Sequence, residues 1–330
     1  MFKKEFITVL RHVLINLGAL ACIASPSITQ AQSWPDKPIK LIIPFAAGGT
    51  TDILGRILAQ QMTTVIGQNV IVENKGGAGG NIGAEVVANS PPNGYTLLLA
   101  SGSMMTVNPF LYKKLPLNYA TDLTYVSAVA GGPMLVSVNP NLPVNNLKEL
   151  IALAKTKELT FGSAGIGSQV HMAGENFIYS AGIAATHVPY KGEAPALNDL
   201  VSGQIDFMVG NLPAAAGFAK AGRIKALAIT SSKRVAQLPD VPTVAEAAIP
   251  GFVNMGWFML AAPSGTPKAI QEKIYAATQK ALVSEAMRKS LEINGLTAIL
   301  NTPKEQLDVQ IKNETANWEK VIKARNIQAQ

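Results

Sequence analysis

Short apolar runs alternate along the chain with segments in which apolar residues recur every three to four positions. Each short run predicts a buried strand, and each recurring pattern predicts a helix with one apolar face. This alternation is typical of α/β layers built on parallel strands. The predicted strands span residues 39–45, 69–73, 95–100, 159–161, 186–190, 205–209 and 224–229.

Three helices carry boundary signals in the sequence. Apolar residues between Ile53 and Met62 share one helix face, and Gly67 follows as a stop signal. The segment 146–149 resembles a capping box ahead of a second helix, and 302–305 combines an N-cap, a first-turn proline and a capping glutamate. The last helix has an apolar stripe from Leu307 to Ile322, which we interpret as a packing face.

Two long apolar segments contain glycine in their middle. Residues 123–138 include Gly131, Gly132 and Pro133, and residues 252–263 include Gly256. Extended segments of this kind can cross between two lobes and absorb a change of backbone angles when the lobes close. We therefore expect a lobe 1 formed by discontinuous parts of the chain.

Residues 1–31 have the pattern of an export signal. Lys3, Lys4 and Arg11 precede the apolar stretch 13–24, and small residues follow at the cleavage position, Thr29-Gln30-Ala31. A lipoprotein signal at Cys22, which follows Ala21, is the alternative. Because Cys22 is the single cysteine, cleavage after Ala31 leaves a chain without a thiol, as suits an oxidising compartment.

Composition excludes several classes of protein. With 48% hydrophobic and 15% charged residues among 330, the chain is neither disordered nor disulfide-based. Loss of residues 1–31 would lower the formal charge from +7 to +5, because three basic residues and one acidic residue go with them. The remaining basic residues are scattered, so we expect no nucleic-acid partner and a soluble exported protein.

Enzyme and cofactor motifs are scarce. After residue 31 the chain has no cysteine and only His171 and His187, which excludes Cys–His chemistry and a histidine-rich metal site. His171 and Glu175 are four residues apart on a predicted helix, and we interpret them as a hydrogen-bonded pair on the helix surface. The glycines of 76–83 miss the spacing of a dinucleotide fingerprint, so this loop is predicted to be a tight turn with positive φ.

Two loops share a pattern that suits an anionic ligand. Residues 44–52 lead from the first strand into the first helix, and residues 161–169 do the same in the second half. Each loop offers small residues, hydroxyls and the free N–H groups of a helix start. One such loop in each half predicts a ligand with an anionic group, held between the lobes.

At these residues the chain resembles the extracytoplasmic solute-binding proteins of tripartite tricarboxylate transporters, often called the Bug family. The resemblance covers the chain after residue 31 and lies in several ordered motifs. These are WPDKPI at 34–39, PFAAGGTTDILGR at 44–56, VENKGGAGG at 72–80, PNGYTL at 92–97, NP with Tyr112 at 108–112, HVPYKG at 187–192, LPDVP at 238–242 and APSGTP at 262–267.

The resemblance implies a two-lobe periplasmic-binding-protein fold of type II, an α/β Venus flytrap that closes on its ligand without catalysis. Each lobe would be a mostly parallel sheet flanked by helices, with two crossover strands as hinge. The expected division is 1–31 signal peptide, 32–132 lobe 1, 133–255 lobe 2 and 256–330 the second part of lobe 1. The expected location is the periplasm, with no cofactor and no metal.

The resemblance also implies a small carboxylate ligand, delivered by a monomer to a large and a small membrane subunit. Ligand contacts would come from the loop 45–51 and the loop 162–169. Ser101, Ser103 and His171 are expected to face the same cleft. Relatives often have an acidic or polar residue where Gly210 stands, so Asn211 is a candidate beside a departure from the pattern. The candidate ligand-binding residues are Phe45, Ala46, Ala47, Gly48, Gly49, Thr50, Thr51, Ser101, Ser103, Gly162, Ser163, Ala164, Gly165, Ile166, Gly167, Ser168, Gln169, His171 and Asn211.

Several alternatives stay open at this stage. A sensing protein that docks on a membrane receptor would need the same pocket, and an enzyme acting through His171 is the third hypothesis. Citrate-like acids, dicarboxylates, acidic amino acids and aromatic acids are all candidate ligands, because backbone N–H groups recognise a carboxylate and not what is attached to it.

Overall fold

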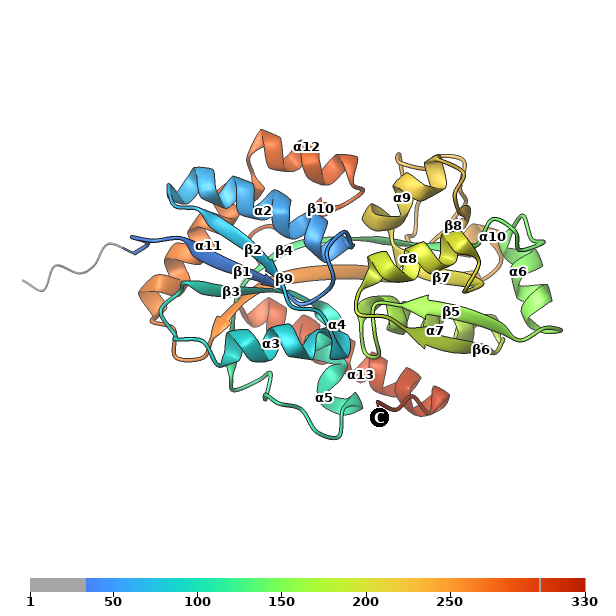
Figure 1. Cartoon of the computed structure of the whole chain (residues 1–330), viewed down its shortest axis with the longest axis horizontal. Coiled ribbons are helices and arrows are strands. Elements are labelled where there is room, and N and C mark those ends of the chain that lie inside the picture. Colours follow the sequence, from blue (N-terminus) through green and yellow to red (C-terminus); the bar gives the residue numbers. More distant parts are fainter. Residues whose placement is uncertain (1–33, 303, 330) are drawn as a thin grey trace, which may run out of the picture. The chain divides into compact units, whose positions relative to one another are not determined.

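Ten β-strands form the frame of the described chain (Figure 1). The computed structural model describes residues 34–302 and 304–329, so the predicted signal peptide 1–31 and Pro303 of the predicted helix start lie outside the described residues. The chain separates into two units, Met1–Asp36 and Lys37–Gln330, and every element below belongs to the second. The strands are β1 Ile39–Ile43, β2 Val70–Asn74, β3 Thr96–Ser101, β4 Leu123–Val138, β5 Leu159–Ser163, β6 Ala185–Pro189, β7 Phe207–Asn211, β8 Lys225–Ile229, β9 Met255–Pro263 and β10 Thr297–Ala298.

Each predicted strand is present, with its ends displaced by at most a few residues. The pairing order is β2-β1-β3-β9-β4-β7-β5-β6, with β8 and β10 also paired to β4. Pairs β1–β2, β1–β3, β5–β6 and β5–β7 are parallel, whereas every pair made by β4 or β9 is antiparallel. The fold is therefore the expected α/β two-lobe fold, in which two parallel three-strand groups are joined through antiparallel central strands.

Strand β4 belongs to both lobes. Its residues from Leu123 to Pro133 pair with β9, and those from Met134 to Val138 pair with β7. We call the elements around β1–β3 and β9 lobe 1, and those around β5–β8 lobe 2. Because the change of partner falls between Pro133 and Met134, we propose to keep the division at 132/133, with the return at 255/256.

The helices begin and end close to the predicted signals. Gly67 ends the first helix in the left-handed conformation at φ 77°, and the Asn146 side chain accepts a hydrogen bond from the Glu149 N–H. The Glu149 side chain in turn accepts a hydrogen bond from the Asn145 N–H, whereas a capping box would use the N–H of Asn146. The helices are α2 Thr50–Ile66, η1 Ala78–Gly80, α3 Asn81–Ala88, α4 Gly102–Thr106, α5 Asn108–Leu111, α6 Leu147–Ala154, α7 Gln169–Ala181, α8 Glu193–Ser202, α9 Leu212–Lys220, α10 Val244–Ala247, α11 Lys268–Leu282, α12 Glu285–Ile293 and α13 Lys304–Arg325.

Helices cover both faces of the lobe 1 sheet. Helices α2, α11 and α12 pack together on one face, and α3, α4 and α13 pack on the other (Figure 1). The predicted stripe of α13 is a packing face, since Leu307 is buried and Ile311, Trp318 and Ile322 are partly buried against apolar clusters. One buried cluster combines Leu98 of lobe 1 with Met208 of lobe 2, so the lobes touch through apolar side chains as well.

The glycine-rich loop 76–83 is the expected tight turn. Gly77, Gly79 and Gly80 all have positive φ, between 60° and 139°, and they carry the chain from β2 through η1 into α3. A Cβ at Gly79 would lie 2.1 Å from the Ile166 carbonyl oxygen of lobe 2. Glycine is thus required here both by the backbone angle and by the close approach of the other lobe.

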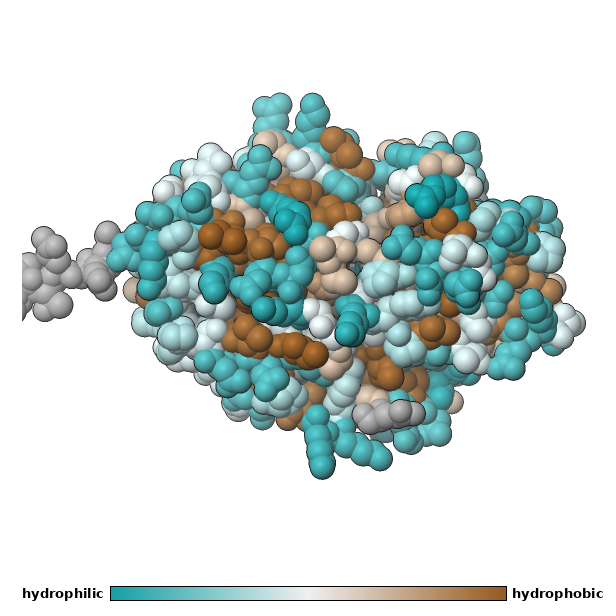
Figure 2. All heavy atoms as spheres, viewed as in Figure 1, coloured by the Kyte–Doolittle hydropathy of each residue, from teal (hydrophilic) through white to brown (hydrophobic). Residues whose placement is uncertain are grey.

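Polar and apolar residues are interspersed over the face shown in Figure 2, with apolar groups over α3, where Ile82 and Val86 are exposed. Among the residues that the structure describes, no helix combines the length and apolar character that crossing a membrane requires.

Candidate functional site

The two predicted loops meet at one small cavity between the lobes. Its volume is about 20 Å³, room for about one water molecule. Loop 44–52 comes from β1 and loop 161–169 from β5, and both lead into helices that start at the cavity, as expected at the carboxyl ends of parallel strands. The lining residues are Phe45, Gly49, Ser101, Ala164, Ser168, Gln169, Val170, Glu193, Asn211 and Phe258.

The first loop contributes Phe45 and Gly49 to the cavity. Ala47 and Gly48 are exposed and do not line it. The Gly48 N–H donates to Asp52 Oδ2 at 2.9 Å, which holds the turn closed. Burial alone would raise the pKa of Asp52, but bonds from Arg56, Gly48 and Asn74 outweigh burial and lower that pKa. Asp52 is thus a fixed anion that shapes the loop.

Residues of the first loop also reach across the cleft. The Ala46 N–H donates to the Lys191 carbonyl oxygen at 3.1 Å. The Thr50 hydroxyl accepts a bond from the Ala214 N–H at 3.3 Å. Thr51 is buried but does not line the cavity. These contacts show the cleft in a closed form.

The second loop contributes Ala164, Ser168 and Gln169. Ser168 is the N-cap of α7 and accepts from the His171 N–H at 3.2 Å. The N–H groups of Gln169 and Val170 then stand at the first turn of the helix, where no intrahelical acceptor exists. Since both residues line the cavity, these donors suit an anionic group placed there.

Gly165 and Ile166 face a second pocket outside the cavity. This pocket, of about 640 Å³, is lined from both lobes, by Tyr112 and Ala78 on one side and Ile166 and Lys191 on the other. The Tyr112 hydroxyl donates to the Ile166 carbonyl oxygen at 2.7 Å, and burial raises the pKa of Tyr112 to about 12. The outer pocket is therefore a second space lined by both lobes, beside loop 161–169.

Other predicted residues support the second loop from behind. Gly162 lies against Ile205, and the Gly167 N–H donates to His171 Nδ1 at 3.1 Å. Ser163 Oγ lies 2.6 Å from His187 Nε2. Burial, followed by the neighbouring His171, lowers the pKa of His187 to about 2, so its ring is neutral. None of Gly162, Ser163, Gly167 and His171 lines the cavity.

Ser101 is the last residue of β3 and Ser103 lies in α4, and of the two only Ser101 lines the cavity. Ser103 lies behind it, with the two hydroxyl oxygens 3.2 Å apart. The pair stands where β3 turns into α4, so the third strand of lobe 1 reaches the same edge as the first.

The interpretation of His171 and Glu175 as a surface pair is wrong. Both side chains are buried, and Nε2 of His171 lies 3.6 Å from Oε1 of Glu175. Arg325, near the end of α13, donates to Glu175 Oε2 at 2.9 Å. Burial tends to raise the pKa of Glu175, but His171 and Arg325 together lower it. The group anchors α13 to α7, and the described residues contain no cluster of three or more metal-ligating side chains.

Glu193 is a cavity residue that the sequence analysis missed. It is the first residue of α8, and its side chain is buried. Oε1 accepts from the Asn211 N–H at 2.5 Å, and Oε2 accepts from the Thr50 N–H at 3.1 Å. Burial raises its pKa despite these bonds. The signal was its position at the start of the helix that follows β6, because parallel strands end at the same sheet edge.

Asn211 and Gln169, which both line the cavity, are joined by a side-chain hydrogen bond. Gln169 Nε2 donates to Asn211 Oδ1 at 2.9 Å, and Gln169 Oε1 accepts from the Trp257 N–H of β9 at 3.1 Å. A Cβ at Gly256 would overlap the Gln169 amide. Gly256 is therefore the place where the crossing strand lets a polar side chain of lobe 2 approach it.

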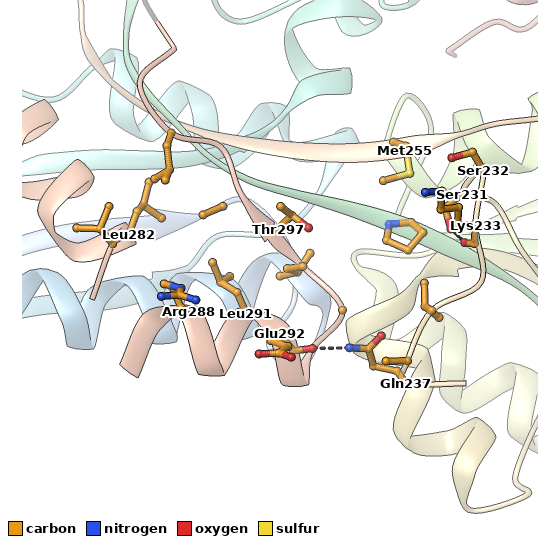
Figure 3. A pocket seen from close by; sticks show the side chains of 18 residues that line it. Ser231, Ser232, Lys233, Gln237, Met255, Leu282, Arg288, Leu291, Glu292 and Thr297 are labelled. Atoms are coloured by element: carbon orange, nitrogen blue, oxygen red, sulfur yellow. Dashed lines mark hydrogen bonds between the residues drawn. The ribbon is translucent and has the colours of Figure 1, made fainter. Parts of the chain in front are cut away.

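Another, larger pocket lies away from the cavity and shares no residue with it. Figure 3 shows it between α12, β10 and the segment 231–237, beside Pro133 and Met255 of the crossing strands. It measures about 830 Å³, and the Gln237 side-chain amide donates to the Glu292 carbonyl oxygen across it. Its lining carries the aliphatic side chains of Leu282 and Leu291, and it lies beside the crossing strands β4 and β9.

Comparison with known proteins agrees with this architecture. A family model described as tripartite tricarboxylate transporter family receptor matches residues 54–327. Protein BugT of Bordetella pertussis is 38% identical over 308 residues, which is 92% of this chain and 94% of that protein.

Solved structures are similar over most of the chain. The periplasmic binding protein BugD has a TM-score of 0.85 at 35% identity, covering 90% of this chain and all of its own. Rpa4515 of R. palustris, solved with adipate, has a TM-score of 0.85 at 36% identity, covering 89% and 99% of the two chains. MatC of Rhodopseudomonas palustris, solved with bound malate, has a TM-score of 0.80 at 32% identity, covering 88% and 100%.

The family match spans most of the chain, and the strand order, the closed cleft and the paired loops are those of a two-lobe binding protein. The chain belongs to the receptor family of the tripartite tricarboxylate transporters, whose Bug-type members are periplasmic solute-binding proteins.

Proposed function

We propose that this protein captures a small carboxylate between its lobes and delivers it to the large and small membrane subunits of a tripartite transporter. The observation that carries the proposal is the meeting of two strand-to-helix loops, one from each lobe, at one small cavity. Adipate and malate, bound by the similar proteins Rpa4515 and MatC, belong to this ligand class.

The carboxylate has a suitable place at the start of α7. Ser168, Gln169 and Val170 all line the cavity, and the N–H groups of Gln169 and Val170 have no acceptor within the helix. A helix N-terminus carries about half a positive charge, so it stabilises a carboxylate without a lysine or arginine. Exclusion of water on closure strengthens each of these bonds.

Capture requires the lobes to separate first. A cavity of about 20 Å³ is far smaller than the roughly 300 Å³ or more of a small-molecule site. Strand β4 changes its partner from β9 to β7 between Pro133 and Met134, directly after Gly131 and Gly132, and the chain returns to lobe 1 at the start of β9. We propose that these two crossings are the hinge. We also propose that the protein binds its ligand without catalysing a reaction.

The transport role includes export of the protein. We propose that residues 1–31 are removed after Ala31 and that the rest of the chain acts in the periplasm as a monomer. The positively charged start and short apolar stretch at 13–24 support this reading.

A thermal-shift screen tests the binding step. Protein comprising residues 32–330 is heated with mono-, di- and tricarboxylates and with uncharged solutes of similar size. A ligand at one hundred times its Kd stabilises the folded state by about 2.7 kcal/mol, which raises the Tm by a few degrees. Stabilisation by uncharged solutes alone would contradict a carboxylate site.

A deletion strain tests the transport step. Loss of uptake of the stabilising acid, restored by the wild-type gene, is the expected result. Normal uptake with lost induction of the genes for its use would instead identify a sensor that signals to a membrane receptor.

A further inference from the structure

The charge of the cavity is set by one side chain. Among the described residues that line it, Glu193 alone has an ionisable side chain, and the others are apolar, amide or hydroxyl residues. Its carboxylate is buried together with the position where a ligand would lie. An acidic group that is buried without a cationic partner is costly, and an incoming positive charge relieves that cost.

Glu193 also occupies the donors that a second ligand carboxylate would use. Oε2 accepts the Thr50 N–H at the start of α2, and Oε1 accepts the Asn211 N–H at the start of α9. Two of the helix N-termini at the cleft are therefore already matched to an anion from the protein. The start of α7, with Gln169 and Val170, is the one we assigned to the ligand carboxylate.

The bonds of Glu193 differ in which lobe they come from. Asn211 belongs to lobe 2, as Glu193 does, and it donates both its N–H at 2.5 Å and its Nδ2 at 3.4 Å. Thr50 belongs to lobe 1, so separation of the lobes breaks that bond and leaves the Asn211 bonds in place. Separation of the lobes would therefore leave Oε2 without a backbone partner, while Oε1 would keep the Asn211 N–H.

We propose that Glu193 is a specificity residue that pairs with an ammonium group of the ligand. The inference rests on the proposed function, since the start of α7 would hold the ligand's carboxylate. The ligand class is then a small amino acid with one carboxylate and one ammonium group, in preference to a dicarboxylate. A dicarboxylate would place its second charge against Glu193, whereas an ammonium would donate to Oε2 before closure and share that oxygen with the Thr50 N–H after it.

Spacer-matched ligands test this inference by titration calorimetry on residues 32–330. The pairs are succinate with β-alanine, glutarate with 4-aminobutyrate and adipate with 5-aminopentanoate, in which one carboxylate is replaced by ammonium on the same carbon spacer. α-Amino acids from glycine to glutamate complete the panel. The wild-type protein should bind its best amino acid at least tenfold more tightly than every dicarboxylate of the panel.

Three variants separate charge from packing. Glu193→Gln keeps the size of the side chain and should weaken amino-acid binding at least tenfold while strengthening dicarboxylate binding. Glu193→Asp keeps the charge and should keep the preference. Glu272→Gln removes an exposed carboxylate on α11 as the matched control and should change neither. The Tm of each unliganded variant reports whether it has folded.

The outcomes distinguish this inference from the proposed function. If the wild-type protein prefers a dicarboxylate, and Glu193→Gln keeps or increases that preference, the inference is overturned. The proposed function as a carboxylate receptor would then still hold. In that case the Glu193 carboxylate would occupy, in the unliganded cleft, the backbone N–H groups that a ligand carboxylate takes over on binding. Absence of binding by every acid and amino acid of the panel would overturn both.

Discussion

The carboxylate of Glu193 on α8 accepts a hydrogen bond from the backbone N–H of Thr50, the first residue of α2, with an N···O distance of 3.1 Å. This bond joins one lobe to the other through the start of a helix. The Thr50 hydroxyl adds a second link, because it accepts from the Ala214 N–H at the start of α9. A single residue of lobe 1 thereby contacts two helices of lobe 2.

Replacement of Thr50 by valine should loosen the closed form. The change keeps the shape of the side chain and removes the acceptor of the buried Ala214 N–H, at a cost of about 1 kcal/mol. Small-angle scattering of the unliganded protein should show a larger radius of gyration than in the wild type. Thr64→Val, at an exposed site on the same helix, is the control. Equal radii of gyration in the two variants would show that the bond between Thr50 and Ala214 does not hold the lobes together.

A larger residue at Gly49 should hold the lobes apart. The backbone of Gly49 has φ −83°, which any residue can adopt, and the atoms nearest to an added Cβ belong to Glu193 and Ala194 of lobe 2, the closest at 3.3 Å. Gly49→Val should therefore leave the circular dichroism spectrum unchanged and weaken ligand binding at least tenfold.

The control for this variant is Gly217→Ala on α9, where an added Cβ would meet no atom within 4 Å. Wild-type affinity in Gly49→Val, measured for whichever acid stabilises the parent protein, would exclude the closed cleft as the bound form.

Acid should destabilise the protein through His187. Its pKa is about 2 in the folded state, compared with about 6.5 in an unfolded chain. Below pH 6.5 the unfolded chain thus binds a proton that the folded protein does not, and the free energy of unfolding falls with falling pH. The slope approaches at most about 1.4 kcal/mol per pH unit.

Denaturant unfolding between pH 7.5 and pH 4.5 measures this slope. His187→Gln removes the titrating ring and should flatten the curve over that range relative to the wild type. Parallel curves for the two proteins would show that His187 is not held neutral in the fold.

Removal of the Arg325 guanidinium should release the end of α13. Arg325→Gln leaves Glu175 with His171 alone, and we expect the free energy of unfolding at pH 7 to fall by about 1–2 kcal/mol. This is below the value for a fully buried pair, because the Arg325 side chain is 26% exposed.

This effect should depend on pH in a defined direction. The pKa of Glu175 is lowered in the folded state, so its contribution to stability is present above the unfolded pKa of about 4.3 and is lost as the pH falls through the folded value. The difference between Arg325→Gln and wild type should therefore shrink toward pH 3. Lys323→Gln, at an exposed position in the same helical turn, should show no difference at either pH.

Local sequence signals predicted most of the frame. The strands, the Gly67 stop and the glycine turn at 76–83 depend on neighbours within a few residues, and each is confirmed. The sequence also led to both loops and to seven of the residues that line the cavity. Their common reason is the rule that parallel strands end at one edge, which needs only the order of the elements.

The missed features depend on distant partners. Glu193 becomes a cavity residue only when α8 meets the starts of α2 and α9, and nothing in its local pattern indicates Thr50 as a partner. His171 and Glu175 are buried because Arg325 and α13 cover them, a contact across 150 residues of sequence. Helical spacing identified the pair but could not reveal its cover.

Strand β9 imposes an order in time on the assembly of the molecule. In the sheet it lies between β3 and β4, and Leu98 of β3 pairs with Ala261 of β9. In the sequence, however, it is synthesised long after both strands. The strands β5 to β8 have all emerged by then, whereas β3 still exposes an unpaired edge. Long-range pairing of this kind is slow, so the first loop should gain its final support only late in folding. A nascent chain ending before Met255 would contain every residue that lines the cavity except Phe258, but it would lack the strand that joins β3 to β4.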